Sequence, residues 1–271
     1  MAELTIVIVS HNTRAELENC LTSLAAAPPS STHEIVVVDN ASSDGTPEAI
    51  RQRWPLVQLI EPGANVGFAA ANNLGIRAAS GPLVLLLNSD TLVPPGALDA
   101  MVAEIRSAPD VAALGPRIVD AAGRAELSFG RMLSPATEAR QKLLVRLYER
   151  GNRLAAWWVE RVTQRTGHPD WVSGACLLVR HADALAAGLL DERYFLYAED
   201  VDFCAALRAL GKRVRFSPAA AIVHLRGRSG RQRPEETERA YRRSQVAFYE
   251  KHHPGWAPLL RWYLRRRGRP L

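Results

Sequence analysis

The sequence predicts an α/β fold built around a central, mostly parallel sheet. Short apolar runs, each too short to cross a membrane, alternate with stretches whose apolar residues recur at helical spacing. Each run ends abruptly in polar residues, which is typical of buried strands whose ligands lie beyond their carboxyl ends. With 271 residues, 47% of them hydrophobic, the chain is long enough for one large domain or two small ones.

The first unit is expected to be a strand, a helix and a strand, over residues 4–9, 14–26 and 34–38. A right-handed crossover places both strand ends on one edge of the sheet, so Ser10 and Asn12 would lie near Asp39. Asp39 can accept from a pyrimidine imide or from ribose hydroxyls, or it can cap the loop that leads to a helix starting at Thr46-Pro47. The loop has neither the GxGxxG nor the GxxxxGK[ST] pattern, which argues against a dinucleotide site and a P-loop.

A short strand over residues 57–60 precedes an Ala-rich helix within residues 63–81. Gly63 and Gly67 are expected to form the turn before this helix, whose first amides could face an anion, with Asn65 beside them. Solvent-facing amides are the alternative for the asparagines here.

The stretch Leu83 to Thr91, LVLLLNSDT, is the clearest buried strand, and it turns polar at Asn88 and Asp90. A carboxylate at such a strand end can hold Mg²⁺ or Mn²⁺, which would neutralise a diphosphate. Capping of the next turn is the alternative.

Further elements expected downstream are a helix at 98–107, a strand at 111–114, an edge strand at 115–120, two amphipathic helices within 133–165, a strand at 171–180 and strands at 214–216 and 219–225. The two amphipathic helices pair apolar residues with arginines, so they suit either a membrane surface or packing on the body of the protein. His224, near the end of the last strand, is either structural or a ligand. The basic loop after it suits phosphate oxygens, and a helix is expected from Pro234 onward.

Residues 194–210 combine aromatic and acidic side chains at a helix start. Tyr194, Phe195 and Tyr197 precede Glu199 and Asp200. Carboxylates at a helix start often act as caps, but one held beside apolar rings is expected to have a raised pKa and to act as a general base.

The charge is unevenly distributed. Residues 131–165 hold 8 Lys/Arg against 3 Asp/Glu, and residues 225–271 hold 13 against 4, so the rest of the chain is net acidic although the whole carries +6. The two basic segments suit a polyanion, either nucleic acid or an anionic membrane. Three widely spaced cysteines indicate neither a disulfide framework nor a zinc site and fit a reducing cytoplasm. No apolar run is long enough for an anchor.

The ordered set TIVIVSHN, VVVDNASSDGT, NVGFAAANNLGI, LLLNSD, WVSGACLLVR, FLYAEDVDFC and IVHLRGRS resembles inverting glycosyltransferases of family 2, most closely their rhamnosyltransferase-like branch. The resemblance implies a GT-A fold, in which a Rossmann-like nucleotide-binding half joins an acceptor-binding half. The implied divisions are a domain over 1–230, with a nucleotide-sugar half (1–120), a basic amphipathic insertion (131–165) and a catalytic half (166–230), and then a basic helical extension (231–271).

The resemblance also implies roles for individual residues. Those lining the nucleotide-sugar site would be Ser10, Asn12, Asp39, Asn65, Gly67 and Asn88. Asp90 and His224 would bind a divalent cation, although Asn88 stands where the family motif has aspartate, which removes one charge. Asp200 would be the catalytic base with Glu199 beside it, and the acceptor side would include Gly174, Ala175 and Tyr197.

The resulting expectation is a hexosyltransferase that passes a deoxysugar such as rhamnose from a nucleoside diphosphate to a glycan or polyprenyl-diphosphate acceptor in cell-envelope polysaccharide synthesis. It would work in the cytoplasm, peripherally on the inner face of the plasma membrane, with no nucleic-acid partner. The rival readings are a sugar-nucleotide nucleotidyltransferase, which would need a Gly-rich loop after the first strand, and a non-enzymatic nucleic-acid-binding module that uses the basic tail.

Overall fold

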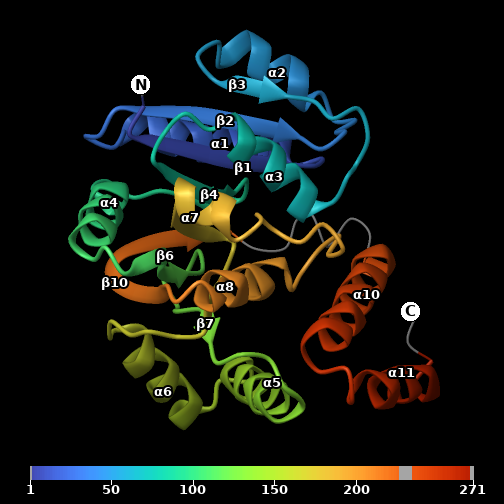
Figure 1. Ribbon diagram of the computed structural model, residues 1–271. Helices are drawn as coiled ribbons and strands as arrows, with labels where there is room; N and C mark the ends of the chain where they lie inside the picture. The colour runs from blue at the N-terminus through green and yellow to red at the C-terminus, as the bar shows by residue number, and fades with distance from the viewer. Residues whose placement is uncertain (1, 226–233, 269–271) are drawn as a thin grey trace.

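One eight-stranded sheet forms the centre of the protein, and helices cover both of its faces (Figure 1). The computed structural model describes residues 2–225 and 234–268. The strands are β1 Leu4–Ser10, β2 His33–Asp39, β3 Gln58–Ile60, β4 Leu83–Asn88, β5 Thr91–Leu92, β6 Val111–Val119, β9 Cys176–Arg180 and β10 Arg213–His224, in the order β3-β2-β1-β4-β9-β6-β10-β5. A separate two-stranded sheet pairs β7 Phe129–Gly130 with β8 Trp171–Val172.

The helices are α1 Arg14–Ala26, α2 Thr46–Arg53, α3 Phe68–Ala78, α4 Ala97–Ser107, α5 Pro135–Glu149, α6 Arg153–Thr163, α7 His181–Ala186, α8 Glu199–Ala209, α10 Pro234–His252 and α11 Ala257–Arg266. Successive side chains of a strand point to opposite faces, and the core divides accordingly. Ile6 and Leu85 pack with Leu17 of α1 on one face, whereas Val7 and Val84 pack with α3, α7 and α8 on the other. Because both faces are covered, β1 and β4 are almost continuously apolar.

The pairing confirms a mostly parallel sheet and places its ligand-binding edge. β1 pairs in parallel with β2 and with β4, so the chain order reverses around β1. β9 is antiparallel to β4 and to β6. The start of β9 therefore lies at the same edge as the ends of β1, β2 and β4.

Several expected elements differ from those observed. Residues 111–119 form one interior strand, β6, between β9 and β10, rather than a strand followed by an edge strand. An interior position tolerates Pro116 because pairing with β9 has ended at Leu114 and the register with β10 shifts between Ser217 and Ala221. That shift also explains why the two strands expected over 214–225 are one bulged strand.

The strand expected over 171–180 is interrupted, because residues 173–175 leave the ladder between β8 and β9. The two amphipathic helices α5 and α6 are present as expected. α6 buries Ala155, Val159 and Thr163 against the body and exposes Leu154 and Trp157. It therefore packs on the protein and still presents an apolar side to its surroundings. The basic loop at 226–233 lies outside the described residues.

All three cysteines are free and buried, so the expectation of no disulfide framework is confirmed. No described helix has the length and apolar character needed to cross a bilayer.

Candidate active site

Polar side chains converge at the carboxyl edge of the sheet, where the strand order reverses around β1. Ser10 ends β1 opposite Asp39, which ends β2, and Asn88 ends β4 opposite Val9. Hydroxyl contacts connect the end of β1 to the residue after Asn88: Ser10 Oγ lies 3.0 Å from Thr13 Oγ1, which lies 2.9 Å from Ser89 Oγ. Such a crevice is where open α/β sheets bind ligands.

Asp39 has one carboxylate oxygen available for a ligand. The residue is only 2% exposed, and its Oδ2 accepts from the Ser42 amide at 2.9 Å. Its Oδ1 is buried and has no hydrogen-bond partner in the described part of the chain. Loop capping therefore accounts for one oxygen and leaves the other for a donor such as an imide N–H.

The two asparagines predicted for the nucleotide site hold loops with their side-chain oxygens. Asn12 Oδ1 accepts from the amide and the hydroxyl of Ser43, at 2.8 and 3.2 Å. Asn65 Oδ1 accepts from Asn40 Nδ2 at 2.9 Å and from the Gly67 amide at 3.1 Å. The sequence interpretation gave no role to Asn40, whose Oδ1 also accepts from the Val66 amide at 2.9 Å. Its place directly after Asp39 at a strand end was the signal that could have identified it.

Gly67 lies where the start of α3 meets the loop that precedes α8. It has φ +87°, and a Cβ there would lie 2.7 Å from Phe195 Cδ2 and 2.8 Å from the Phe195 carbonyl oxygen. That carbonyl accepts from the Phe68 amide at 2.7 Å. The first amide of α3, expected to face an anion, is therefore already satisfied by Phe195.

A second polar group surrounds His224. Its Nε2 lies 3.1 Å from Asp90 Oδ1 and 3.5 Å from Asn88 Nδ2, and its Nδ1 lies 3.4 Å from Glu126 Oε2. Burial opposes the charged imidazolium, but hydrogen bonds and charge from Asp90 and Glu126 outweigh burial and raise the pKa of His224 to about 9. Glu126 was not anticipated, because it lies in an irregular segment without a motif.

The residues around His224 fit a hard divalent cation. Asp90 offers a carboxylate, Asn88 Oδ1 is buried without a partner among the described residues, and Glu126 contacts the ring nitrogen opposite the one that faces Asp90. In residues 2–225 and 234–268 no group of three or more His, Cys, Asp and Glu is arranged to hold a metal. Donor oxygens from a diphosphate ligand would have to complete the coordination.

Asp200 is held by backbone amides at the start of α8. Its Oδ2 accepts from the Gly174 amide at 2.9 Å, and its Oδ1 accepts from the Val201 amide at 2.8 Å. Burial raises the pKa of Asp200, and these amide bonds only partly offset it. The adjacent Ala175 carbonyl accepts from the Asn88 amide at 3.0 Å, which connects Asp200 to the end of β4.

Glu199 lies beside Asp200 but faces the interior. It is buried, and its Oε2 has no partner among the described residues. Burial, and secondarily the charge of Asp200, raise the pKa of Glu199 well above its ordinary value. Burial therefore favours the neutral form of Glu199, whereas at Asp200 the Gly174 and Val201 amides partly offset the same effect.

The three aromatic residues before α8 do not form one wall around the acids. Tyr194 is fully buried and donates to Asp202 Oδ1 at 3.3 Å. Phe195 covers Gly67, and Tyr197 packs edge-on against Tyr241 of α10 at 5.6 Å between ring centroids. Tyr197 and Ala198 both have φ +69°, which turns the chain sharply into the helix.

A cleft of about 540 Å³ brings Asp200 and His224 together. Ser173, Trp171 and Val201 form one part of its lining, and one side of α5 forms another. This volume lies within the range of small-molecule sites.

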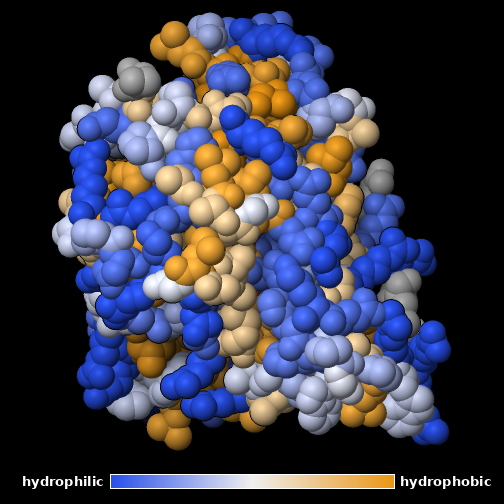
Figure 2. Space-filling view, in the orientation of Figure 1, coloured by the Kyte–Doolittle hydropathy of each residue, from blue (hydrophilic) through white to orange (hydrophobic). Residues whose placement is uncertain are grey.

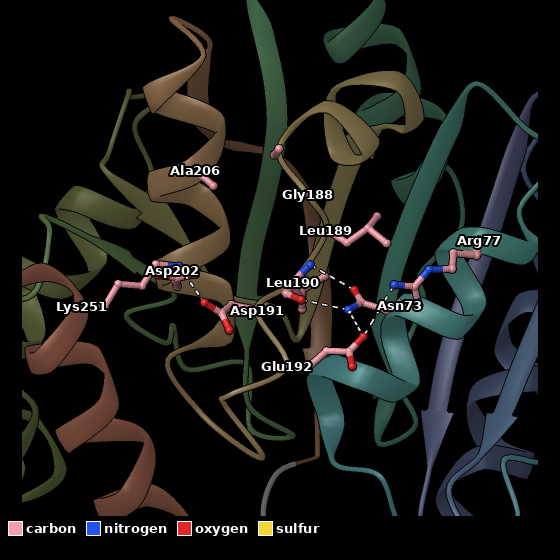
Figure 3. A pocket seen from close by; sticks show the side chains of 11 residues that line it. Asn73, Arg77, Gly188, Leu189, Leu190, Asp191, Glu192, Asp202, Ala206 and Lys251 are labelled. Atoms are coloured by element: carbon pink, nitrogen blue, oxygen red, sulfur yellow. Dashed lines mark hydrogen bonds and ion pairs between the residues drawn. The ribbon is translucent and has the colours of Figure 1, made fainter.

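A second pocket, of about 330 Å³, lies on the other side of α8, between it and α3 (Figure 3). Asn73 bonds the Leu190 backbone in both directions and also Glu192, while Lys251 lies 2.8 Å from both Asp191 and Asp202. Its charged side chains are paired with one another. These bonds hold α8 and the loop before it in place from the side opposite the 540 Å³ cleft.

Comparison with known proteins identifies the fold and the family. The model of "Glycosyl transferase family 2" matches residues 5–158, and that of "Glycosyl transferase family group 2" matches residues 83–267. The chain is 34% identical to the N-acetylglucosaminyl-diphospho-decaprenol L-rhamnosyltransferase of Mycobacterium tuberculosis, over 97% of this chain and 89% of that protein.

Two solved structures share the fold. The mannosyltransferase PcManGT of Pyrobaculum calidifontis, solved with GDP-mannose and Mn²⁺, superposes with a TM-score of 0.64 at 20% identity, covering 96% of this chain and 68% of that one. S. aureus TarS superposes with a TM-score of 0.61 at 16% identity, covering 92% and 39%. The expected GT-A fold is confirmed.

We expect Gly67→Ala to lower the free energy of unfolding by about 1–3 kcal/mol, because it adds left-handed strain and a clash with Phe195. Gly63→Ala is the matched control, since Gly63 has φ +81° in the same loop but open space around its Cβ position. Denaturant unfolding of both variants measures the difference. Equal losses would show that the contact with Phe195 is unimportant.

We expect Glu199→Gln to become more stable than the wild type as pH rises. The native pKa of Glu199 is raised, so its stabilising contribution is present below the unfolded pKa and is lost as pH rises through the folded pKa. Glutamine stays neutral and avoids about 1.4 kcal/mol of loss per unit of raised pKa. Unfolding between pH 4 and 9 tests this, with the exposed Glu48→Gln as control; parallel pH profiles for wild type and Glu199→Gln would contradict it.

Proposed function

The chain belongs to glycosyl transferase family 2, and on that basis we propose that it transfers an L-rhamnosyl unit from a nucleoside-diphosphate sugar to a diphospho-polyprenol-linked sugar in cell-envelope synthesis. The observation that carries the proposal is the match to the mycobacterial rhamnosyltransferase along almost the whole chain. Family membership makes the protein a glycosyltransferase and disfavours both rival readings, the nucleotidyltransferase and the nucleic-acid-binding module.

The donor would lie across the ends of β1, β2 and β4. In this proposal Asp39 Oδ1 accepts from the nucleotide base or ribose, with Ser10 and the loops shaped by Asn12, Asn65 and Gly67 around it. Asn88 would lie at the diphosphate, next to the cation site.

Asp90 and His224, helped by the Asn88 oxygen, would hold Mg²⁺ or Mn²⁺. A divalent cation there neutralises the negative charge that develops on the departing nucleoside diphosphate. The solved mannosyltransferase with Mn²⁺ supports the choice of cation. Glu126 would orient His224 through the opposite ring nitrogen.

Asp200 would act as the general base. It removes a proton from an acceptor hydroxyl, whose oxygen bonds to the anomeric carbon as the bond to the diphosphate oxygen breaks. The Gly174 and Val201 amides fix the carboxylate, and its raised pKa makes it a better proton acceptor. A single displacement from the face opposite the leaving group inverts the anomeric configuration. Gly174, Ala175 and Tyr197 would shape the acceptor side.

A polyprenyl-linked acceptor implies that the enzyme acts at a membrane surface. Two helices, α6 and α11, lie at the lower edge of the molecule in Figure 1. Both expose aromatic residues. Arg161 lies over the Trp157 ring, Arg266 over Trp262 and Arg267 over Tyr263, at 5.2, 4.8 and 5.5 Å to the ring centroids. Aromatic rings favour the interface, and each nearby arginine contributes about 1 kcal/mol toward an anionic leaflet. Figure 2 shows hydrophobic patches among hydrophilic surface along the same edge.

Replacement of Asp200 by asparagine should lower kcat by about 10²–10⁴-fold while leaving donor binding intact, because only proton removal is lost. Steady-state kinetics and donor calorimetry measure the two effects, and Asp110→Asn, an exposed acid paired with Arg213, is the control. Turnover within tenfold of wild type would remove Asp200 from the role of base.

Asp90→Ala and His224→Ala should each weaken donor binding in the presence of Mn²⁺, the aspartate variant more strongly because it removes a full charge. In excess chelator, wild type and variants should bind the donor with similar, weaker affinity. Calorimetry provides the comparison. A donor affinity that changes neither with chelator nor with either substitution would contradict the cation site.

Binding to liposomes should rise with the fraction of anionic lipid and fall with added salt. Trp262→Ser/Tyr263→Ser should reduce it at least about tenfold, since both aromatic rings then leave the interface. Sedimentation with vesicles measures it, and Leu56→Ser, a 97% exposed apolar residue outside α6 and α11, is the control. Equal binding to neutral vesicles, or no binding at all, would contradict the membrane role.

A further inference from the structure

The side of α5 that lines the active-site cleft has no role in the reaction described so far. Its residues follow helical spacing along a single stripe: Glu138, Gln141, Lys142, Val145, Arg146 and Glu149. The same cleft contains Asp200 and His224. Whatever binds in front of Asp200 therefore also meets this stripe.

The acid at the start of the stripe is already compensated. Glu138 Oε1 accepts from Gln245, and its Oε2 accepts from Tyr249 at 2.8 Å. Lys142 lies 2.5 Å from Glu138, yet its side chain remains 51% exposed. Hydrogen bonding to Glu138 and the nearby Tyr241 outweigh burial and raise the pKa of Lys142, so it stays cationic.

Arg146 lies one turn after Lys142 and is exposed toward the same cleft. Its guanidinium makes no ion pair within residues 2–225 and 234–268. Side chains four residues apart on a helix are neighbours, with Cβ atoms about 6 Å apart, so the two cations can contact adjacent phosphates of one diphosphate. Arginine binds phosphate oxygens in bidentate fashion, and lysine binds them as a point charge.

We propose that Lys142 and Arg146 form a subsite for the diphosphate of the acceptor, which holds the acceptor sugar between α5 and Asp200. The inference rests on the proposed function and extends it to the recognition of the acceptor. The donor diphosphate has its own place at Asp90 and His224. The lipid would leave the cleft along α5, which packs against α6, toward the exposed aromatic residues.

The two basic residues thereby give the enzyme a way to select its acceptor. A sugar bound through its diphosphate at α5 presents to Asp200 only the hydroxyl at the matching distance. A free sugar lacks that anchor and loses charge-assisted hydrogen bonds at both cations.

The test compares two acceptors of the same sugar, a polyprenyl-diphosphate-linked N-acetylglucosamine and an alkyl N-acetylglucosaminide without phosphate. Lys142→Ala and Arg146→Ala should each raise KM for the first acceptor by about tenfold or more, with kcat nearly unchanged. KM for the alkyl glycoside and affinity for the donor should stay at wild-type values. Lys142→Arg and Arg146→Lys should recover part of the loss.

Arg140→Ala is the matched control, because Arg140 is an exposed cation on the same helix outside the cleft stripe. It should leave all constants unchanged. Equal KM increases for both acceptors would overturn the subsite, and so would equal effects in Arg140→Ala. A loss of donor affinity would assign the two cations to the donor diphosphate instead.

Binding of inorganic pyrophosphate in excess chelator separates this inference from the proposed function. Wild type should bind it, and Lys142→Ala/Arg146→Ala should bind it at least about tenfold more weakly, whether or not either acceptor is turned over. If the wild type uses neither acceptor, the proposed function fails, but this titration still shows whether Lys142 and Arg146 bind a diphosphate. Equal pyrophosphate affinity in wild type and double variant would overturn it.

Discussion

The active site depends on the pairing of β4 with two neighbours of opposite direction. β4 runs parallel to β1, so Asn88 ends beside Val9 and close to Ser10. It runs antiparallel to β9, so the segment that enters β9 is at the same edge, where the Asn88 amide bonds the Ala175 carbonyl. The neighbouring Gly174 amide then holds Asp200. One strand end thus connects the proposed nucleotide side, the proposed cation site and the proposed base, and a one-residue slip of β4 would turn its apolar side chains to the wrong faces.

Two adjacent acids at the start of α8 are kept chemically distinct by their surroundings. Both have a raised pKa because of burial, but Asp200 receives two backbone amides while a buried oxygen of Glu199 receives none from the described residues. The amides partly offset the effect of burial on the pKa of Asp200, so the two acids differ through hydrogen bonding rather than through residue type.

The sequence predicted the α/β class, most helices, and the convergence of Ser10, Asp39 and Asn88, because buried apolar runs and their polar ends are local signals. It did not predict that β6 is interior, since the compensation for Pro116 lies in the register of β10, a strand about a hundred residues away. The sequence placed the aromatic residues before α8 beside the acids, but in the structure they have separate partners: Asp202 for Tyr194, Gly67 for Phe195 and Tyr241 for Tyr197. Glu126 was not predicted because its contact with His224 arises only in the tertiary structure, whereas Asn40 had a local signal in its place directly after Asp39.

The helix α10 fastens both walls of the cleft. Tyr241, Gln245 and Tyr249 reach Glu138 of α5, while Lys251 and His252 reach the buried Asp202 of α8. On the ribosome, both walls are synthesised before α10, so Asp202 lacks its contacts with Lys251 and His252 until that helix has emerged. A buried carboxylate that has the Tyr194 hydroxyl but lacks a cationic partner is costly, and it favours α8 remaining loosely attached during that interval. The geometry of the catalytic centre is therefore completed among the last steps of folding, after the sheet on which it stands.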